Sequence, residues 1–344
     1  MFQNPHSDNH PTIAYQMDNP FKNKNYKYGT ESFLSMYLNQ YQFVLGADLE
    51  SYSKSDGLFN NDNPCNIYFV LRRPKVTINP ESFTSNKVKA NFDFIIHEKE
   101  HYGVINLAIE LKNASSKLEL KTEYPYNLFA ITDNSKTLLV ARPSSMIDRV
   151  EMENNVETDL LDYEILYIGQ AYGRDGERTA LERLAAHETV QNIYTHSLTN
   201  NPDCDIWILL TNFSQLNLLF NLDSDLIDFN EENEKKDFKK GNEFIDNNGL
   251  NFTEKQKINF TEAALIKYFE PTYNKEFKDT FPNKNHKSYS ECYTLDVRAL
   301  TIELETSEMV RNIYTEKSGR KKYHKQMFEF NDDNDRISLL GMYL

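Results

Sequence analysis

The sequence predicts an α+β protein with two domains, and three observations support this class. The chain has 344 residues, of which 39% are hydrophobic and 13% aromatic, and this length exceeds that of one ordinary domain. Apolar and polar residues alternate between about 65 and 142, which is typical of antiparallel strands with one buried face. Apolar residues recur at helical spacing over about 178–194 and again from Thr261 to Pro271, where the proline ends the helix.

These patterns divide the chain into consecutive units. The expected units are a flexible N-terminal arm at 1–28, a β-rich N-terminal domain at 29–147, a second domain at 160–285 and a C-terminal extension at 286–344. A short helix is expected at Glu31–Tyr41, and a charged connection between the domains at about 148–159. Residues 222–257 carry runs of charged side chains, which predict a solvated polar insertion in the second domain.

Charge, cysteine content and hydropathy exclude several classes of protein. The 38 basic and 52 acidic residues give a net charge of −14, which argues against a protein that coats nucleic acid by electrostatics alone. Cys65, Cys204 and Cys292 are far apart in the sequence, so neither a disulfide framework nor a structural zinc site is expected. No apolar run is long enough to span a bilayer. We therefore expect a cytoplasmic protein without a membrane partner, and the sequence leaves open whether it forms a homo-oligomer.

A group of chemically useful residues begins on an expected strand. Tyr167, Ile168 and Gly169 end this strand, and a glycine-containing loop leads to an expected helix that carries Arg183 and His187. Because 187 − 183 = 4, both side chains would stand on one face of that helix, one turn apart. A guanidinium and an imidazole that face the same way could hold a phosphate and transfer a proton.

A second helix contributes an isolated carboxylate. Glu262 is the only acid in the expected first turns of the helix that begins at Thr261, on a face with Ile266 and Phe269. A carboxylate on an otherwise apolar face needs a partner, and a hard cation is one candidate. The helix is followed by the turn Pro-Thr-Tyr-Asn, which ends at Asn274.

Together these segments resemble the GIY-YIG nuclease superfamily over about residues 160–285. The resemblance rests on three features in family order: the Tyr-Ile-Gly strand, the R-x-x-x-H pattern, and a distal glutamate followed by P-x-Y-N. It implies a small antiparallel sheet flanked by helices and hydrolysis of DNA with a single Mg²⁺ or Mn²⁺ ion. The implied roles are metal binding by Glu262, phosphate binding by Arg183, positioning or deprotonation of the attacking water by Tyr167, proton transfer by His187, and bracing of the active-site turn by Asn274.

The resemblance also implies features for which this sequence leaves several residues open. A first-strand tyrosine, in the family's Gly-Ile-Tyr motif, is expected about a dozen residues before Tyr167. Tyr163 is too close to serve, and Tyr124 or Tyr126 would require a long insertion. The distance from the tyrosine to the arginine is 183 − 167 = 16 residues, so Arg174 and Arg178 compete with Arg183 as phosphate ligands. His196 lies where some family members place a further histidine.

Each residue also has a purely structural interpretation. Tyr167 could be part of a core strand, and Arg183 and His187 could lie on a solvated helix face. The charge of Glu262 could serve only to interact favourably with the dipole at the start of its helix. His97-Glu98-Lys99-Glu100-His101 has the letters of a zinc motif but joins two alternating segments, so we expect a charged hairpin.

Two further groups are candidates for nuclease chemistry or DNA contact. Asp93, Glu110 and Lys112 resemble the D-x(n)-E-x-K arrangement of PD-(D/E)xK nucleases, although the polar outer face of a β-meander explains them equally well. A basic cluster in the C-terminal part offers a contact to a DNA backbone. Its members are Arg311, Lys317, Arg320, Lys321, Lys322 and Lys325.

The sequence therefore predicts a metal-dependent endonuclease that hydrolyses DNA phosphodiester bonds. A role in restriction or antiviral defence is expected by analogy, because a large additional domain accompanies the catalytic core. The alternative is a non-catalytic module that binds nucleic acid or protein on a decayed GIY-YIG scaffold.

Overall fold

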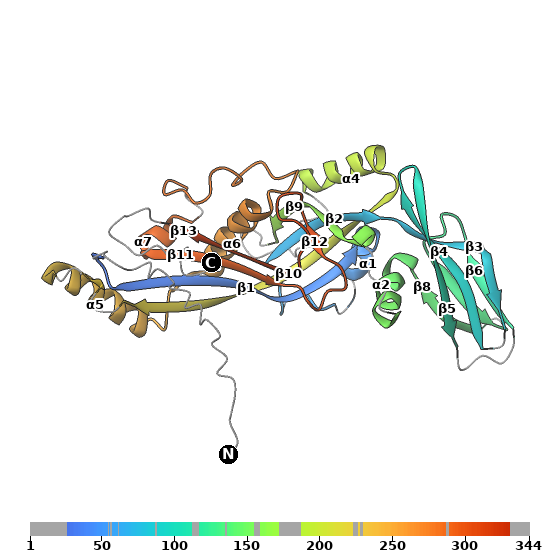
Figure 1. Cartoon of the computed structure of the whole chain (residues 1–344), viewed down its shortest axis with the longest axis horizontal. Coiled ribbons are helices and arrows are strands. Elements are labelled where there is room, and N and C mark those ends of the chain that lie inside the picture. Colours follow the sequence, from blue (N-terminus) through green and yellow to red (C-terminus); the bar gives the residue numbers. More distant parts are fainter. Residues whose placement is uncertain are drawn as a thin grey trace, which may run out of the picture.

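The computed structural model shows a mixed α+β chain organised around a curled central sheet (Figure 1). It describes residues 26–53, 55, 57–60, 62–86, 88–111, 117–134, 136–154, 159–171, 187–222, 226–227, 230–286 and 289–330. The predicted N-terminal arm, 1–28, lies outside these residues except for its last three, of which Tyr26 is buried and pairs with Ile227.

The central sheet has seven strands in the order β12-β9-β2-β10-β1-β11-β13. Their bounds are β1 (Thr30–Leu45), β2 (Ile67–Pro74), β9 (Tyr163–Gln170), β10 (Cys204–Asn221), β11 (Val297–Glu305), β12 (Ile313–Tyr314) and β13 (Tyr323–Glu329). The pairs β1/β11 and β9/β12 are parallel, and the other pairs are antiparallel. The units predicted at 29–147, 160–285 and 286–344 all contribute strands to this one sheet, so those boundaries do not separate structural units.

The helix predicted at Glu31–Tyr41 is wrong, because these residues belong to β1. Leu34 and Met36 alternate with less buried neighbours and point into the main core, as expected for a strand. β1 pairs with β10 on one side and with β11 on the other. This pairing on both edges decides the conformation of a segment whose local apolar pattern fits either period.

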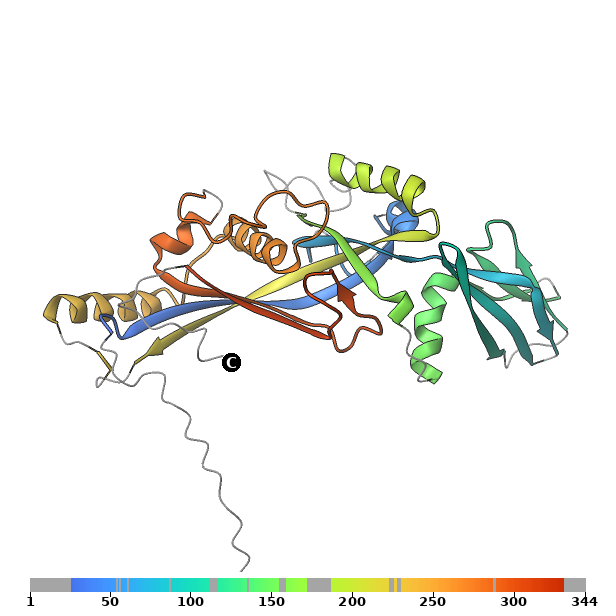
Figure 2. The same cartoon turned by 45° about the horizontal axis from the view of Figure 1, so that its top comes forward.

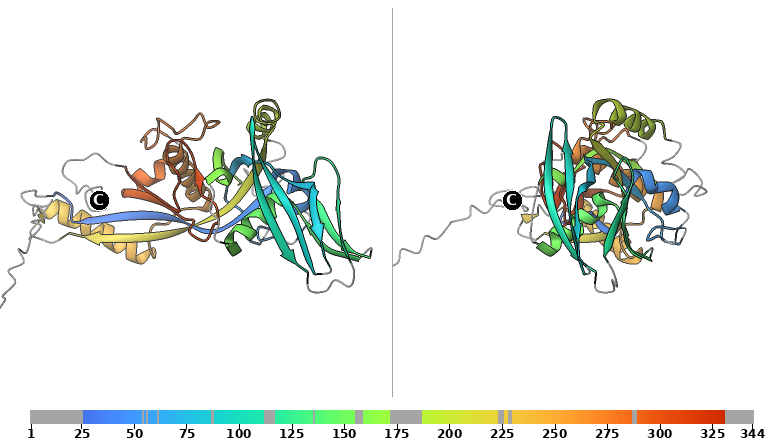
Figure 3. Two further views of the ribbon diagram at one scale, coloured as in Figure 1. Left: turned by 45° about the vertical axis from the view of Figure 1, so that its right-hand side comes forward. Right: turned by 90° about the vertical axis from the view of Figure 1, so that its right-hand side faces the viewer.

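A small β-sandwich is inserted between β2 and β9, at the right of Figure 1. Its first sheet contains β3 (Val76–Ser85), β4 (Lys89–Glu98) and β5 (His101–Glu110), and its second contains β6 (Leu118–Thr122), β7 (Phe129–Asp133) and β8 (Lys136–Ala141). Figure 3 shows the two sheets from further directions. Phe92 and Phe94 of the first sheet contact Phe129 of the second, at ring-centroid distances of 5.4 and 5.9 Å. The two sheets therefore share a core separate from that of the central sheet.

An arginine at the end of β2 links the inserted sandwich to the central sheet. Arg73 is 1% exposed, and its guanidinium donates to both carboxylate oxygens of Asp148 at 3.0 and 2.9 Å. It also lies 4.6 and 4.5 Å from the ring centres of Tyr163 and Trp207. Asp148 belongs to α2 (Pro143–Asn154), which follows the sandwich, and it accepts a second charged bond from Arg311 at 2.9 Å. The connection predicted at 148–159 is thus partly a helix that is tied to the central sheet by two arginines.

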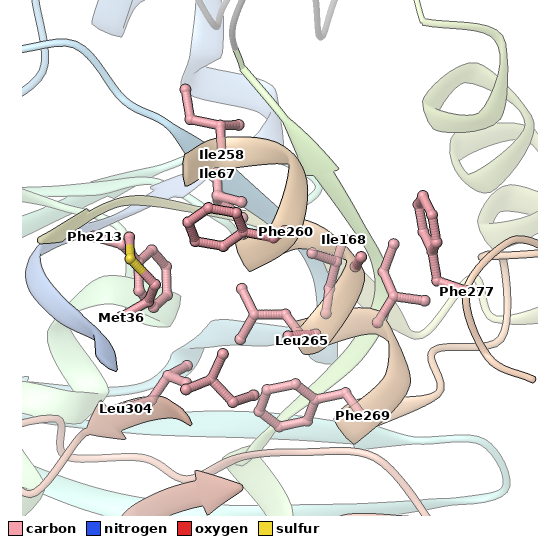
Figure 4. Close-up of a cluster of buried hydrophobic side chains, with 14 of the residues drawn as sticks. Met36, Ile67, Ile168, Phe213, Ile258, Phe260, Leu265, Phe269, Phe277 and Leu304 are labelled. Carbon is pink, nitrogen blue, oxygen red and sulfur yellow. The ribbon is translucent and has the colours of Figure 1, made fainter. Parts of the chain in front are cut away.

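Helices cover both faces of β2 and β9. The helices on these faces are α4 (Glu188–Asn200) and α6 (Glu254–Phe269). Further helices are α5 (Glu231–Asp246) and the short η1 (Gly46–Asp48), α1 (Leu49–Ser53), η2 (Asp159–Leu161) and α7 (Ser290–Thr294). α6 packs on the face of β2 that carries Ile67 and Phe69, whereas Val190 and Ile193 of α4 join Tyr68 on the opposite face. Figure 4 shows Phe260, Leu265 and Phe269 of α6 among the buried side chains of the first face.

The polar insertion predicted at 222–257 contains an ordered helix. α5 begins at an Asn230 cap whose side chain accepts from the Glu232 amide at 2.8 Å, and none of its residues is buried. Asp237 on this helix accepts from the Gly29 amide at 2.7 Å, and Figure 2 shows α5 at one end of the elongated sheet. The prediction of a solvated segment holds for the side chains of α5, whereas Phe252, near the end of the segment, is buried in the main core. The helix itself is stabilised by its cap and by the contact with Gly29, which precedes β1.

The basic cluster predicted to contact DNA is largely compensated within the fold. Arg311 is buried and bonded to Asp148, and Arg320 pairs with Asp162 at 3.2 Å. The ammonium of Lys322 donates to two backbone carbonyls. Two further pairs are Lys317 with Glu270 and Lys325 with Glu303. These contacts give most members of the cluster a structural role, while Lys317 and Arg320 keep exposed side chains. A contact of the cluster with a DNA backbone stays a prediction.

Across the part of the chain that the structure describes, no helix is both long and apolar enough to cross a membrane.

The burial of His324 allows a prediction of how the free energy of unfolding changes with pH. Its Nε2 donates to the Ile313 carbonyl at 3.1 Å, and its Nδ1 lies 3.1 Å from the Tyr268 hydroxyl. Burial lowers the pKa of His324 from 6.5 to about 4. Between these values the unfolded chain binds the proton and the folded chain does not, so stability falls as the pH falls.

We expect His324→Gln to lower stability at pH 7 but to remove part of its acid dependence. The wild type should lose about 2 kcal/mol more than the variant between pH 7 and pH 4.5. Urea unfolding at a series of pH values measures the slope of unfolding free energy against pH for each protein. Parallel slopes for the two proteins would contradict this assignment.

Candidate functional site

The site is built on the far end of β9, where one edge of the strand has no neighbouring strand among the described residues. β12 pairs with β9 only at Tyr163 and Glu164, so it does not reach the segment from Leu166 to Gln170. Buried backbone N–H and C=O groups need partners. Here α6 and the turn after it supply them, at every second residue of β9.

Three residues provide these contacts along the edge. The Tyr273 amide donates to the Leu166 carbonyl at 3.0 Å. The side chain of Asn274 takes the next position, since its Oδ1 accepts from the Ile168 amide at 2.9 Å and its Nδ2 donates to the Ile168 carbonyl at 2.8 Å. Asn274 is 7% exposed, and it acts as a substitute for a missing strand. It thereby joins the turn after α6 to the Tyr-Ile-Gly segment.

Glu262 occupies the last position on the same edge. Its Oε1 accepts from the Gln170 amide at 3.1 Å, and its Oε2 accepts from the Gln170 side-chain Nε2 at 3.0 Å. The carboxylate is 9% exposed and lines an open cleft. It comes from the middle of α6, because the helix begins at Glu254 after a Thr253 capping box and not at Thr261 as predicted.

Two tyrosines lie on the α4-facing side of the sheet and line the same cleft. Tyr167 is on β9 and Tyr68 is on the adjacent strand β2, with ring centroids 6.1 Å apart. Gly169 pairs with Tyr68 in the antiparallel register. A Cβ atom at Gly169 would lie 2.7 Å from Tyr167 Cε1 and 2.8 Å from Tyr68 Oη. The absence of a side chain at Gly169 therefore allows both rings to occupy this place.

Tyr68 is a residue of the cleft that the sequence analysis missed. The structure places it on the strand next to Tyr167, whereas Tyr124 and Tyr126 lie in a loop of the inserted sandwich. The signal in the sequence is Asn66-Ile67-Tyr68, which differs from Gly-Ile-Tyr only at its first residue. It was overlooked because 167 − 68 = 99 positions separate the two tyrosines, and the sandwich occupies that interval.

His187 contributes an imidazole to the cleft from the start of α4. Its ring centroid is 5.6 Å from that of Tyr167. His187 has φ −84° and ψ 117°, so it precedes α4 in an extended conformation. Of the helix predicted over 178–194, the described part begins only at Glu188, and residues 178–186 lie outside the described residues. Arg183, with its rivals Arg174 and Arg178, lies outside the described residues, and the predicted one-turn relation between Arg183 and His187 stays a prediction.

A second histidine stands further along α4. His196 Nδ1 lies 3.1 Å from the Tyr273 hydroxyl, and both side chains line the cleft. The pair connects α4 with the turn after α6, so the helices from the two faces of the sheet meet at the open edge of β9.

Four of the five predicted site residues border one cleft of about 670 Å³. Tyr167, His187, Glu262 and Asn274 line it, although they come from β9, the start of α4, α6 and the following turn. Gln170 and Tyr68 also border it, and neither was among the predicted site residues. Such a cleft places an acid, an imidazole and phenol groups around a volume that admits a phosphate group and water.

The donor set of this cleft suits a hard divalent cation. No group of three or more His, Cys, Asp and Glu side chains among the described residues is placed to share a metal ion. Glu262 instead offers a single buried carboxylate. Mg²⁺ often binds through one or two carboxylates and keeps the rest of its shell for water and substrate phosphate. The residues therefore fit one such ion, with Glu262 as its protein ligand.

The other predicted sites do not assemble in this way. Asp93 accepts from Asn106 at 2.6 Å, whereas Glu110 faces Lys89, four residues from Asp93 along β4. At ~3.3 Å per residue the two acids are about 13 Å apart along the strand, too far to share one ion. Lys112 lies outside the described residues.

The segment His97–His101 forms the turn between β4 and β5, as expected for a charged hairpin. It supplies no helix that would bring the two histidines onto one face.

Comparisons with family models, with curated proteins and with solved structures gave no significant match to this chain.

The packing at Gly169 gives a direct structural prediction. Gly169→Ala should destabilise the chain by about 1 to 3 kcal/mol, because Tyr68 is buried and cannot swing away from the new methyl group. Urea unfolding measures the loss. Gly103→Ala is the matched control on β5, because its Cβ would lie 3.6 Å from the nearest atom of Ile96, in ordinary contact. Equal stability of the two variants would contradict the close packing of Gly169.

Because Asn274 pairs with the backbone of β9, we expect a negatively charged side chain at this position to destabilise the fold strongly. In Asn274→Asp the second oxygen would face the Ile168 carbonyl without a proton to donate, at a cost of about 2 to 4 kcal/mol. Asn283→Asp is the matched control, because that exposed side chain uses only its oxygen, which accepts from the Asn285 amide. Thermal and urea unfolding measure the stability of the two variants. A loss of stability in Asn274→Asp as small as that in Asn283→Asp would contradict the pairing of Asn274 with β9.

Proposed function

We propose that this chain is a metal-dependent endonuclease that hydrolyses DNA phosphodiester bonds and is a divergent member of the GIY-YIG superfamily. The observation that carries the proposal is the convergence of Tyr167, His187 and Glu262 on one cleft. These residues come from three elements, namely β9, the residue before α4, and α6. The neighbouring Tyr68, on the strand paired with Tyr167, supports the proposal further.

The proposed reaction follows from the positions of these groups. Glu262 would hold a Mg²⁺ or Mn²⁺ ion at the open edge of β9, and that ion would supply positive charge to the scissile phosphate. Tyr167 would position the attacking water, and the nearby imidazole of His187 would take or return a proton. Asn274 would keep the turn after α6 fixed against β9. Arg183 remains the proposed phosphate ligand.

The inserted sandwich offers this activity a means of target selection. It leaves the central sheet between the two tyrosine-bearing strands and is anchored through Arg73 and Asp148. A recognition unit anchored in this way would hold DNA at a fixed distance from the cleft. This supports the proposal of a role in restriction or defence against foreign DNA.

DNA cleavage by the wild type and by Glu262→Gln tests the proposal. Glutamine keeps the size of the side chain and can keep both contacts if the Gln170 amide turns over, so the fold should survive. We expect metal-dependent cleavage by the wild type and a loss of at least about 100-fold in the variant. Plasmid, linear duplex, single-stranded, modified and phage DNA should be tried with Mg²⁺ and Mn²⁺.

Glu254→Gln is the matched control, because this exposed acid on the same helix pairs with Lys257 and does not line the cleft. It should cleave like the wild type. Cleavage that survives in Glu262→Gln would refute the assignment of the site. No cleavage by the folded wild type on any substrate would favour the non-catalytic binding module.

A further inference from the structure

The second contact of Gln170 identifies a residue with no assigned role. The backbone N–H of Gln170 donates to Glu262 and completes the strand edge. Any residue at this position could make that bond. The side-chain amide of Gln170 adds a separate bond, 3.0 Å long, to the other oxygen of Glu262. The two donors come from one residue and reach both oxygens of one carboxylate.

This arrangement fixes the orientation of the carboxylate. A single hydrogen bond leaves a carboxylate able to rotate about its terminal torsion, which has broad minima. One donor on each oxygen removes that rotation. Because each carboxylate oxygen has two lone pairs, the bond from Gln170 does not by itself prevent that oxygen from binding a cation.

Gln170 itself is held in place by the sheet. Its backbone pairs with Ile67 in the register of β2 and β9. Its neighbour Gly169 pairs with Tyr68 of β2, and the Ala171 amide donates to the carbonyl of Asn66, just before β2, at 2.8 Å. Glu262 is on α6, which packs on the same sheet through Ile258, Leu265 and Phe269. The contact between Gln170 and Glu262 therefore joins two rigid elements, and a residue of this kind typically tunes a metal ligand from behind.

We propose that Gln170 is a positioning residue that sets the affinity of the Glu262 site for its divalent cation. This inference rests on the proposed function, in which Glu262 is the metal ligand. Gln170 does not touch the substrate in this account. It acts by holding the carboxylate plane in the orientation that accepts the ion, so that binding does not have to freeze a mobile side chain.

Gln170→Met is the variant that isolates the side-chain bond. Methionine has a similar length, keeps the backbone N–H contact and lacks a donor. We expect its dissociation constant for Mn²⁺, measured by electron paramagnetic resonance of free Mn²⁺, to rise about 10-fold or more. The Mn²⁺ concentration that half-saturates cleavage should rise equally, while kcat at saturating Mn²⁺ changes much less. Gln191→Met, on the exposed side of α4, is the matched control and should bind Mn²⁺ like the wild type.

A double-mutant cycle separates positioning from a general structural effect. In the Glu262→Gln background, Gln170→Met should not change Mn²⁺ binding further, because the ligand it orients is gone. A similar loss in both backgrounds would overturn the inference, and so would wild-type Mn²⁺ affinity in Gln170→Met alone. If the wild type neither binds Mn²⁺ nor cleaves DNA, the proposed function fails and this inference fails with it. If the wild type does both and only the Gln170→Met prediction fails, the proposed function stands.

Discussion

The open edge of β9 is the constraint on which the site depends. A strand buried in a protein needs partners for its backbone along both edges. β12 provides them only at the beginning of β9. The remainder is completed by Tyr273, Asn274 and Glu262, which bond to alternate residues of the strand. Side chains that complete a strand are held as firmly as backbone, and here one of them is a carboxylate that borders a cleft.

The hydrogen bonds that complete the edge of β9 stabilise the fold and also hold the residues of the proposed active site in place. Asn274 uses its whole amide to bind the backbone of Ile168 and therefore serves the fold. Glu262 uses one oxygen for the strand edge and borders the cleft with the same carboxylate group. The close contact between Gly169 and the two tyrosines fixes the other wall of the cleft. A site assembled in this way is preorganised, because its parts are ordered by folding and not by the ligand.

The sequence identified residues that line one cleft better than it predicted the architecture around them. Tyr167, His187, Glu262 and Asn274 could be found because each lies in a short local pattern. Tyr68 could not be paired with Tyr167 from the sequence, since the inserted sandwich separates them and only strand pairing brings them together. Gln170 was missed for a different reason: glutamine has no motif, and its role depends on a bond to a residue 92 positions away.

The architecture was mispredicted where long-range contacts decide the outcome. Residues 31–41 have apolar spacing that suits a helix, but they pair with β10 and β11 and form a strand. The ion pairs of Arg311 and Arg320 could not be predicted either, because their acidic partners, Asp148 and Asp162, are far away in the sequence. The division into consecutive domains failed because the central sheet combines strands from the beginning, middle and end of the described chain.

The most direct test of this account is to locate a bound cation. Anomalous diffraction from crystals grown with Mn²⁺ and a non-cleavable DNA analogue would show the ion independently of any activity. The account predicts one strong peak at about 2.1 Å from a carboxylate oxygen of Glu262, within the cleft that Tyr167 and His187 border. A peak elsewhere, or a Glu262 carboxylate without an ion at saturating Mn²⁺, would contradict it.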